Sequence, residues 1–479
     1  MRKLILIEKD DLPKKEVFGR DIKLENYRKI LGINYSQDIY YSAEQGLNPN
    51  ACLAIAGTLI DGKNFHLYLP KNYPNGDPDL LKKLDYLTDF QLCNDFFNRR
   101  LENIIKQKNF ISAELKSSEQ EINIQTEKIQ CLIGCRGAGK STLLAEKAKY
   151  LLNKNIYPLL IVAPFQNNLL NFRSQLENFQ LSKIFFLPPD ETIRRNIGAK
   201  YLLIDESAAI APLQLFELIK KYPNFSLATS LEGYEGSANY FLIKTLPLIS
   251  NNSEVIYLSE SYRFSNEDHL SSCLNAIFCR DFEYKIDTNS STEEINFRSV
   301  TQQELFENEY LLAQIVALLN QAHYRNRPED IKILLDIPLQ ILVVAENKLG
   351  QIIGICQTKI ETPLPDETIS AVISGTSRPR GRILMQQLLF NTKNPAWGKI
   401  QIARVCRIAV AEELRRQKIG ANLIKKTIEI LPNNYQLGVI YSFNEEVQSF
   451  WLGNNFRQMW KSNQARSRNL GESCILVQS

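Results

Sequence analysis

Residues 128–141 read KIQCLIGCRGAGKS, a short β-rich run that leads into a glycine-rich turn. Within it, Gly134, Gly139, Lys140 and Ser141 fit the pattern G-x-x-x-x-G-K-[ST], and the helical pattern STLLAEKAKYLL begins at once. Glycines let the backbone curl so that successive N–H groups point at a phosphate, and the following helix adds its positive end. The alternative is a glycine-rich turn without a nucleotide. The strand before the turn and the helix after it favour a nucleotide site.

The residue types around this loop indicate chemical roles. We expect Lys140 to reach the β- and γ-phosphates of ATP and to act in hydrolysis, and the Ser141 hydroxyl to ligate Mg²⁺. The apolar run YLLIDE, residues 201–206, ends in Asp205, which is placed to hold the Mg²⁺ shell. Glu206 is the candidate to orient or deprotonate the attacking water. A capped strand end is the alternative for the two acids, and the preceding loop favours the metal site.

Three other residues extend this candidate site. Thr229 and Ser230 end the next β-rich run and resemble the sensor segment of helicase-like ATPases, with ordinary strand-end capping as the alternative. Arg263, in SESYRFS, is a candidate to neutralise γ-phosphate charge as an arginine finger does, with surface solvation as the alternative.

The loop belongs to a region in which strand and helix patterns alternate. This alternation predicts a parallel sheet covered by helices on both faces. The β-rich runs are residues 128–134, 157–164, 200–206, 225–230 and 254–259.

Polar stretches suggest where this region begins and ends. They occupy residues 111–127 and 287–294, and a capping-box spacing at Thr301–Glu304 opens a helix after the second. We therefore expect a small α/β domain over 1–110, in which we find no catalytic pattern, the ATPase domain over 111–290, and an α+β domain over 291–479.

The composition is that of a soluble globular protein. The 479 residues carry a formal net charge of +4 and are 44% apolar, which excludes collagen-like, disordered and disulfide-scaffold proteins. No apolar run approaches the ~20 residues that span a bilayer, and the N-terminal apolar stretch is too short for a secretory signal. Nine cysteines without a CxxC pair, and only three histidines, favour free thiols over disulfides or a zinc site. We expect a cytoplasmic protein, and its mild basicity permits a nucleic-acid partner.

A second informative stretch is QIARVCRIAV, residues 401–410, followed by AEELRRQKIGANLIKKTIEI. An apolar strand with interleaved basic residues, a short loop and an amphipathic helix resemble the GNAT acetyltransferase fold. In that fold, the strand end faces the pantetheine arm of acetyl-CoA, and the loop with the helix N-terminus holds the pyrophosphate. The usual loop is [QR]-x-x-G-x-[GA]. Here Arg415 and Gly420 keep the outer positions, Lys418 replaces the glycine, and a plain basic helix start is the alternative.

The downstream segment Asn444–Phe456 resembles the ending N-x-x-A-x-x-[LF]-Y-x-x-x-G-F of that fold. There a tyrosine often protonates the departing CoA thiolate. Trp451 occupies its position and has no acidic hydroxyl, so this general acid is missing or supplied elsewhere. We expect Phe450, Trp451 and Phe456 to pack in the core as well.

An ATPase followed by a GNAT domain in one chain resembles the bacterial tRNA(Met) cytidine acetyltransferase family, over about residues 128–479. Members of that family N4-acetylate the wobble cytidine of elongator tRNA(Met) with acetyl-CoA and ATP. The matching motifs are RGAGKS (136–141), LLIDESAAI (202–210), GYEGS (233–237), AHYRNRPEDIKILLD (322–336), SGTSRPRGRIL (374–384) and RIAV (407–410). The resemblance implies a P-loop NTPase domain with a parallel sheet and an α+β GNAT acetyltransferase domain, preceded by the small N-terminal α/β domain.

The resemblance also implies the binding residues. ATP contacts fall on Gly134, Cys135, Arg136, Gly137, Ala138, Gly139, Lys140, Ser141, Thr142, Leu143 and Arg263. Acetyl-CoA contacts fall on Ile408, Ala409, Val410, Arg415, Arg416, Gln417, Lys418, Ile419, Gly420 and Ala421. The expected cofactors are ATP with Mg²⁺, and acetyl-CoA.

The expected partner is the tRNA anticodon loop, with no membrane and no DNA. Arg378, Arg380 and Arg382 are candidates for RNA-phosphate contacts or for positioning the substrate, with a solvated basic turn as the alternative. Because a thioester is already activated, we expect ATP hydrolysis to remodel the anticodon loop rather than to drive acyl transfer. Two alternatives stay open: an RNA-remodelling ATPase with a degenerate acetyltransferase domain, and an ATP-regulated protein N-acetyltransferase.

Overall fold

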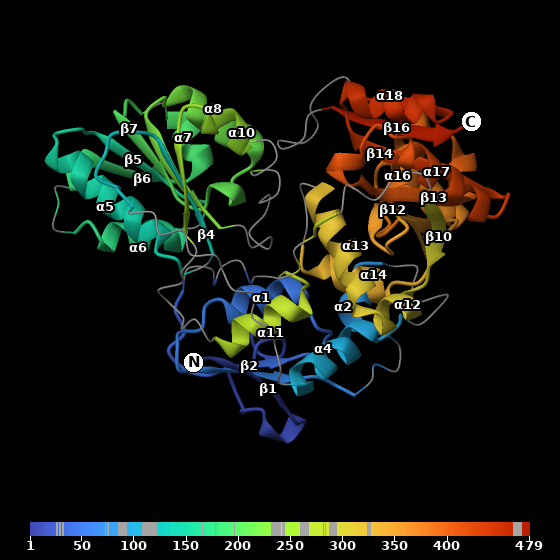
Figure 1. The fold of residues 1–479 in the computed structure, drawn as a ribbon, viewed down its shortest axis with the longest axis horizontal. Coiled ribbons are helices and arrows are strands. Elements are labelled where there is room, and N and C mark those ends of the chain that lie inside the picture. The colour runs from blue at the N-terminus through green and yellow to red at the C-terminus, as the bar shows by residue number, and fades with distance from the viewer. Residues whose placement is uncertain are drawn as a thin grey trace. The chain divides into compact units, whose positions relative to one another are not determined.

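Figure 1 shows a computed structural model of the chain, which groups into two compact units. The first unit contains Met1–Pro70, Leu101–Asp281 and Tyr324–Glu329, and the second contains Lys71–Arg100, Phe282–His323 and Asp330–Ser479. The structure describes residues 1–479 except 25–26, 28–29, 31–32, 72, 74–75, 85–92, 108–121, 136, 165, 178, 180, 196, 231–240, 242–244, 259–267, 281, 283, 287–294, 323–326 and 463–471. Both predicted domain boundaries, at 110/111 and 290/291, lie outside the described residues, so the three predicted domains stay a prediction.

The first unit begins with a small parallel sheet in the order β1-β3-β2. Its elements are β1 (Lys3–Ile7), β2 (Ile39–Ser42), β3 (Asn64–Tyr68) and the fully buried helix α1 (Pro49–Ala56). A buried ion pair joins it to helix α11 (His269–Ile277), because Arg2 Nε donates to Asp268 Oδ1 at 3.1 Å. The helix α4 (Phe96–Gln107) follows later in the chain.

A six-stranded parallel sheet in the order β6-β5-β7-β8-β4-β9 forms the rest of this unit, as the alternating pattern predicts. Its strands are β4 (Gln130–Gly134), β5 (Leu159–Val162), β6 (Ile184–Leu187), β7 (Tyr201–Ile204), β8 (Phe225–Thr229) and β9 (Glu254–Leu258). Its helices are α5 (Lys140–Asn153), α6 (Gln166–Ser174), α7 (Pro189–Arg195), α8 (Pro212–Lys221) and α10 (Leu246–Ser250). Figure 1 shows α5 and α6 on one side of the sheet and α8 and α10 on the other.

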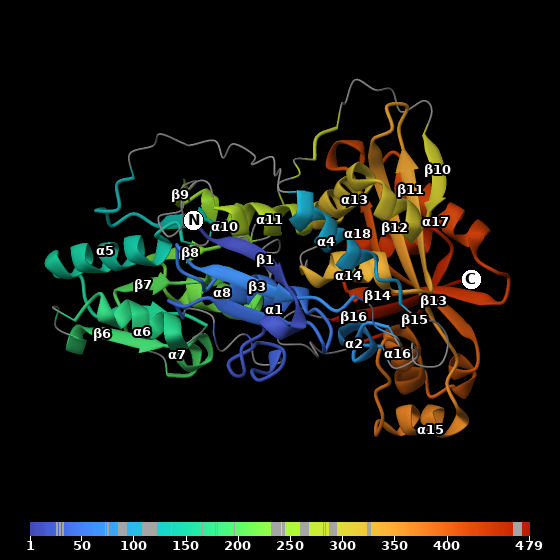
Figure 2. The same cartoon turned by 90° about the horizontal axis from the view of Figure 1, so that it is seen from below.

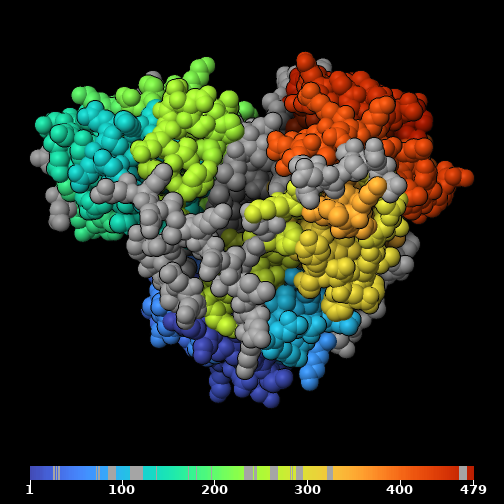
Figure 3. Space-filling view, in the orientation of Figure 1, coloured from blue at the N-terminus to red at the C-terminus, as the bar shows by residue number. Residues whose placement is uncertain are grey.

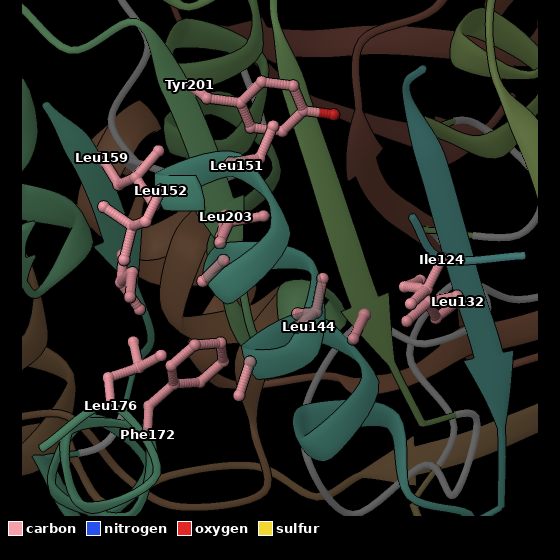
Figure 4. Packing of buried hydrophobic residues seen from close by; sticks show 14 of the residues in the cluster. Ile124, Leu132, Leu144, Leu151, Leu152, Leu159, Phe172, Leu176, Tyr201 and Leu203 are labelled. Atoms are coloured by element: carbon pink, nitrogen blue, oxygen red, sulfur yellow. The ribbon is translucent and has the colours of Figure 1, made fainter. Parts of the chain in front are cut away.

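Strand alternation supplies an apolar core to each face of this sheet. Leu132 and Leu203 join Leu144 of α5 in one cluster, which Figure 4 shows at close range. Ile133 and Ile204, their neighbours in sequence, join the cluster that includes α8 on the opposite face. Because successive side chains point to opposite faces, strands this apolar must be covered twice.

The second unit is built on a seven-stranded sheet in the order β10-β11-β12-β13-β14-β16-β15 (Figure 2). Neighbouring strands are antiparallel except β13 and β14, which are parallel. The strands are β10 (Asn296–Val300), β11 (Gln340–Glu346), β12 (Ile352–Glu361), β13 (Gln401–Val410), β14 (Tyr435–Ser442), β15 (Phe456–Lys461) and β16 (Ser473–Gln478). The helices are α2 (Pro78–Leu81), α12 (Gln302–Glu307), α13 (Glu309–Ala322), α14 (Glu329–Asp336), α15 (Asp366–Ser374), α16 (Ile383–Thr392), α17 (Ile419–Ile430) and α18 (Glu445–Gly453).

The two faces of this sheet carry different helices. Val405 and Leu437 pack with Leu423 of α17 and Trp451 of α18 in one apolar cluster. Ile402 packs on the opposite face with a second cluster formed largely by α15 and α16. Side chains fill the spaces between the ribbons of each unit (Figure 3). None of the helices in the described part of the chain has the length and apolar character that a bilayer-spanning segment requires.

A buried lysine of α5, which covers one face of the six-stranded sheet, gives a test of this packing. Lys147 is 0% exposed, and its ammonium donates to the Lys128 carbonyl at 2.9 Å and to Gln130 Oε1 at 2.7 Å. Burial lowers the pKa of Lys147 from 10.5 to about 8, and the charge of Glu254 opposes this shift. Between pH 8 and 10.5 the unfolded chain therefore binds a proton at this site that the folded chain has released, so folding gains stability as the pH rises.

We predict that this pH dependence is lost in Lys147→Met. From pH 8 to 10.5 the unfolding free energy of the parent protein should rise relative to the variant by on the order of 3 kcal/mol. The difference between the two proteins should be constant from pH 6 to 7. Denaturant unfolding of both proteins across this range measures the difference and cancels the titration of other groups. A constant difference up to pH 10.5 would contradict the buried position of Lys147.

Candidate functional site

The glycine-rich turn of the first unit has the backbone that a phosphate loop requires. Gly137 and Gly139 have φ of 84° and 78°, in the left-handed region that side chains disfavour. A Cβ at Gly134 would lie 2.7 Å from the carbonyl oxygen of Leu258, so only glycine fits between β4 and β9. The helix α5 begins directly after Gly139, and no side chain caps it there. Its first N–H groups therefore have no partner inside the helix.

The predicted lysine lies inside this turn. Lys140 is 5% exposed, and its ammonium donates to the carbonyls of Gly134 at 3.1 Å and Cys135 at 2.7 Å. Ala138 is buried, whereas Thr142 on the first turn of α5 is exposed. A phosphate in the loop would replace two neutral carbonyl partners of Lys140 with negatively charged oxygens, which make stronger hydrogen bonds. Leu143 packs against the core and anchors the helix start.

The acids predicted to serve Mg²⁺ come to the same edge of the sheet. The Ser141 hydroxyl donates to Asp205 Oδ2 at 2.8 Å, although 64 residues separate them. Asp205 is 1% exposed and accepts from the backbone N–H of Glu206 at 3.0 Å. A hydroxyl and a carboxylate at this distance, beside a phosphate loop, are a suitable donor set for Mg²⁺. Asp205 and Ser141 thus fit the ion that the sequence predicts.

The backbone at Glu206 turns sharply, with φ of 49° and ψ of 47°. The Ser230 hydroxyl donates to Glu206 Oε2 at 3.3 Å, and Thr229 Oγ1 accepts from the N–H of Ala208 at 3.1 Å. Both residues come from the end of β8, which lies between β7 and β4 in the sheet. Thr229 and Ser230 therefore connect the acidic turn to the strand beside the phosphate loop, a position from which they can respond to a bound nucleotide.

Three elements of the sequence-based site lie outside the described residues. They are Arg136 within the loop, Arg263, and the segment 233–237 that reads GYEGS.

In the second unit, β13 and β14 part halfway along their length. The two strands are paired from Gln401 and Tyr435 as far as Val405 and Val439. From Gly438 to Ser442, β14 pairs with β16 on its other side, while residues 407–410 of β13 remain paired with β12 on theirs. Parallel strands that separate leave backbone N–H and C=O groups on their facing edges for another partner. The predicted contacts at Ile408, Ala409 and Val410 lie on this edge.

The loop after β13 presents the start of α17. Lys418 has φ of 63° and ψ of 4°, so this lysine adopts the left-handed conformation that the usual glycine would. No side chain caps the helix there, and the first helical N–H bonded to the preceding turn is that of Asn422, to the Lys418 carbonyl at 3.0 Å. The N–H groups of Ile419, Gly420 and Ala421 are therefore free of intrahelical partners. The geometry suits a pyrophosphate.

The side chains around this turn are exposed. Arg416 forms an ion pair with Glu446 at 3.1 Å, with both side chains more than three quarters exposed. Arg415 Nε donates to the carbonyl of Val410 at 3.4 Å, and Gln417 lies at the surface. Neither arginine is held by a buried partner, so both can turn towards an anion at low cost.

Trp451 packs as the sequence suggests and supplies no acid. It is 3% exposed and makes edge-to-face contacts with Phe450 and Phe456, at centroid distances of 5.1 and 4.8 Å. A residue that sequence analysis missed is Tyr441 of β14, past the point where the strands part. Within the described residues its buried hydroxyl has no hydrogen-bond partner, and burial raises its pKa to about 12. Nothing in the sequence distinguishes Tyr441 from an ordinary aromatic residue of a strand.

One predicted RNA contact is wrong. Arg382 is 6% exposed, and its guanidinium donates to the Thr362 carbonyl at 2.8 Å and to Thr362 Oγ1 at 2.9 Å. Those bonds commit Arg382 to the fold, so it cannot reach an RNA phosphate. Arg378 and Arg380 are exposed, and Arg380 donates to the carbonyl of Lys82.

We predict that the start of α17 tolerates a change at Lys418 but not at Gly420. Lys418→Gly removes a left-handed non-glycine residue and should bind acetyl-CoA within about threefold of the parent protein. A Cβ at Gly420 would lie 3.2 Å from Phe450 Cε2. Gly420→Val should therefore displace the helix start and weaken binding by at least about tenfold.

Calorimetric titration with acetyl-CoA measures both effects. Gly453→Val is the matched control, because a Cβ at Gly453 meets no atom within 4 Å. Equal affinities of the Gly420 and Gly453 variants would show that acetyl-CoA does not bind at this helix start.

Comparison with known proteins identifies both regions. Residues 131–281 match the family model "RNA cytidine acetyltransferase NAT10/TcmA, helicase domain", and residues 314–436 match the model "GNAT acetyltransferase 2". The crystal structure of the ribosomal-protein-S18-alanine N-acetyltransferase from Escherichia coli aligns with 39% of this chain and 93% of its own, at 12% identity and a TM-score of 0.26. That structural likeness adds nothing to the assignment from the two models.

Curated relatives share both regions and their order. The tRNA(Met) cytidine acetyltransferase TmcA of Vibrio cholerae is 25% identical over 86% of this chain and 61% of its own length. The proteins of the same name from Idiomarina loihiensis and Saccharolobus islandicus are 26% and 27% identical, over 92% and 62% of this chain and 72% and 39% of their own lengths. The chain thus spans less than two thirds of the length of the V. cholerae and S. islandicus relatives. In order along the chain, one region thus matches the helicase domain of RNA cytidine acetyltransferases and the next matches a GNAT acetyltransferase domain.

Proposed function

We propose that this protein transfers an acetyl group from acetyl-CoA to N4 of the wobble cytidine of elongator tRNA(Met) in the cytoplasm, with ATP hydrolysis remodelling the anticodon loop. The observation that carries the proposal is the presence in one chain of two uncapped helix starts, each preceded by a left-handed residue, at Gly139 and Lys418. Such starts favour phosphate groups. Relatives that carry the same pair of domains are named tRNA(Met) cytidine acetyltransferases.

In the first unit, ATP would be held by the loop from Gly134 to Leu143, with Lys140 on its phosphates. Ser141 and Asp205 would hold Mg²⁺, which supplies charge neutralisation during phosphoryl transfer. Glu206 would hold the attacking water, since its carboxylate is kept in place by the Ser230 hydroxyl. The Ser141–Asp205 hydrogen bond keeps the two candidate ligands together before any ion binds.

In the second unit, acetyl-CoA would be held by the N–H groups at the start of α17 and by the exposed edge of β13. It supplies an acyl group that is already activated as a thioester. The backbone N–H groups of Ile408 and Val410, which point away from β12, can orient its pantetheine arm as an added strand would pair. Arg415 and Arg416 can then turn to the phosphates from the positions they hold in the loop.

The acceptor explains the need for ATP. The exocyclic amine of cytidine is a poor nucleophile, so transfer depends on orientation beside the thioester. In a folded anticodon loop the base is stacked, and unstacking costs a few kcal/mol, which nucleotide hydrolysis readily covers. Arg378 and Arg380, exposed before the start of α16, are the candidates for phosphate contacts that position the loop.

The decisive experiment is mass spectrometry of nucleosides from tRNA(Met) incubated with purified protein, acetyl-CoA and ATP. We expect N4-acetylcytidine with the parent protein and a loss of at least about a hundredfold in rate with Lys140→Ala, because phosphate contacts carry most of the catalysis in phosphoryl transfer. Equal rates without ATP, or with Lys140→Ala, would contradict the coupling to hydrolysis.

Two other results would overturn the acceptor or the reaction itself. Acetylated protein that survives ribonuclease treatment, with no acetylated nucleoside, would indicate a protein acetyltransferase. RNA-stimulated ATP hydrolysis by a protein that does not bind acetyl-CoA would indicate a remodelling ATPase with a degenerate second domain.

The assignment of the Mg²⁺ ligands makes a separate prediction. Asp205→Asn keeps the size of the side chain and removes the charge, so ATP hydrolysis should fall by at least about a hundredfold and require a higher Mg²⁺ concentration. Ser141→Ala should raise the Mg²⁺ requirement in the same direction. Glu146→Gln, an exposed residue of α5 beyond the loop, is the control that should leave that requirement unchanged. Titration of ATPase activity with Mg²⁺ distinguishes these variants, and an unchanged Mg²⁺ requirement in Asp205→Asn would exclude it as a ligand.

A further inference from the structure

A β-bulge in the second unit gathers three basic side chains on one face of the sheet. Gln357 pairs with Arg407 and Thr358 pairs with Val405, so Cys406 is an extra residue on β13. Directly opposed residues of antiparallel strands share a face. Lys359 pairs with Arg404, so these two share a face. Gln357 lies two residues before Lys359 on the same face and pairs with Arg407, so Arg407 lies on that face too. Without the bulge, Arg404 and Arg407 would point to opposite faces.

Two of these three cations have fixed anionic partners. Arg404 Nε donates to Glu361 Oε1 at 2.6 Å, and Glu361, which is 0% exposed, also accepts from the N–H groups of Leu384 and Met385 at the start of α16. Arg407 forms an ion pair with Asp330 of α14. These bonds place the basic face on the side of the sheet that α14 and α16 cover, opposite α17.

The third basic side chain, that of Lys359, has no fixed anionic partner among the described residues. Lys359 is half-buried, and in the described part of the chain its ammonium makes no hydrogen bond or ion pair. Burial lowers the pKa of Lys359, Arg404 and Arg407 add to that effect, and Cys406 and Asp330 oppose it. An amine in such surroundings gives up its proton more readily than an exposed lysine does. Lys359 thus differs from its two neighbours both in pairing and in basicity.

The position of Lys359 relates it to the gap between β13 and β14. Its partner Arg404 lies opposite Gly438, one pair before the strands part at Val405 and Val439. Neighbouring strands are about 4.8 Å apart, which is within the length of a lysine side chain. A thioester held on the α17 side and directed into the gap meets, on the other face, the side chains of the bulge and Lys359.

We propose that Lys359 is the proton acceptor for acetyl transfer, and that the face formed by Lys359, Arg404 and Arg407 receives the acceptor base. This proposal rests on the proposed function, because it assumes an exocyclic amine as the nucleophile. Arg404 and Arg407 are held by Glu361 and Asp330, so they stay in place beside the lysine and add to the burial that lowers its pKa.

The chemistry balances with groups that the proposed reaction already supplies. The amine nitrogen forms a bond to the acetyl carbon, the carbon–sulfur bond breaks, and its electron pair leaves with the CoA thiolate. The proton lost by the amine passes to the neutral Lys359 Nζ, which becomes an ammonium and later releases it to solvent. The thiolate takes up one proton from solvent, so no further reactant is needed.

Two variants of Lys359 separate base catalysis from packing. Lys359→Met keeps the length of the chain and removes the nitrogen, and Lys359→Arg keeps a positive charge that cannot be removed at neutral pH. Since general base catalysis contributes about 10²–10⁴-fold, kcat for tRNA acetylation should fall at least about a hundredfold in both. The KM for acetyl-CoA should be unchanged. Lys425→Met, an exposed lysine on α17, is the matched control and should keep parent kcat.

A pH profile and a direct titration give readouts that a structural role would not move. For the parent protein, kcat should rise tenfold per pH unit and level off at the pKa of Lys359, whereas Lys359→Arg should lose that ionisation. Reductive ¹³C-methylation of the unliganded protein, with the Lys359 signal assigned from Lys359→Arg, should show it titrating below the ordinary lysine range.

Each result decides between the proposals. Parent protein that acetylates tRNA, with a Lys359→Arg variant that is folded and retains kcat within about fivefold, would overturn the role of Lys359 and leave the proposed function standing. A titration at or above the ordinary lysine pKa would overturn it too. Parent protein that acetylates no tRNA, yet binds acetyl-CoA, would overturn the proposed function itself.

Discussion

Both candidate sites depend on the same backbone constraint, a left-handed residue placed directly before a helix. Gly139 before α5 and Lys418 before α17 both adopt the left-handed conformation at the point where the chain enters the helix. Neither start is capped by a side chain, whereas α11, α12 and α18 are capped by Asp268, Thr301 and Asn444. A capped start has used its donors, and an uncapped one retains them for an anion. The two uncapped starts are thus suited to phosphate in a way that those three capped helices are not.

The need for a left-handed residue before each helix explains why the first loop was easier to predict from sequence than the second. Glycine, lysine and serine at fixed spacing are visible in the phosphate loop because each residue type does something that others cannot, and the parallel sheet follows from alternating strand and helix patterns. The second loop was harder, since Lys418 stands where glycine is usual. Its left-handed conformation, with φ of 63°, shows that a lysine can take this turn, at a cost of about 1–2 kcal/mol.

Other features depend on contacts between distant residues. Arg382 is predicted to contact RNA or to lie in a solvated turn, and its burial depends on Thr362, 20 residues earlier. The bulge at Cys406 leaves no mark in a strand that alternates well on either side of it. Residues 71–100 group with the second unit, where the fully buried Lys332 pairs with Asp77 at 2.7 Å. No local sequence pattern at Asp77 predicts an ion pair with a residue as distant in sequence as Lys332.

The bulge at Cys406 also determines to which face of the sheet each later side chain of β13 points. Ile408 and Val410 pack against the cluster that includes α17 because Cys406 is accommodated as a bulge and takes no place in the ladder. If Cys406 occupied a regular ladder position instead, Arg407 would point to the apolar cluster, and Ile408 and Val410 would point to the polar side. The bulge at Cys406, rather than the identity of the residue there, therefore decides which face of the sheet is apolar and which is charged. Deletion of Cys406 alone would therefore keep both faces as they are, whereas an insertion that extends the ladder by one residue would reverse them.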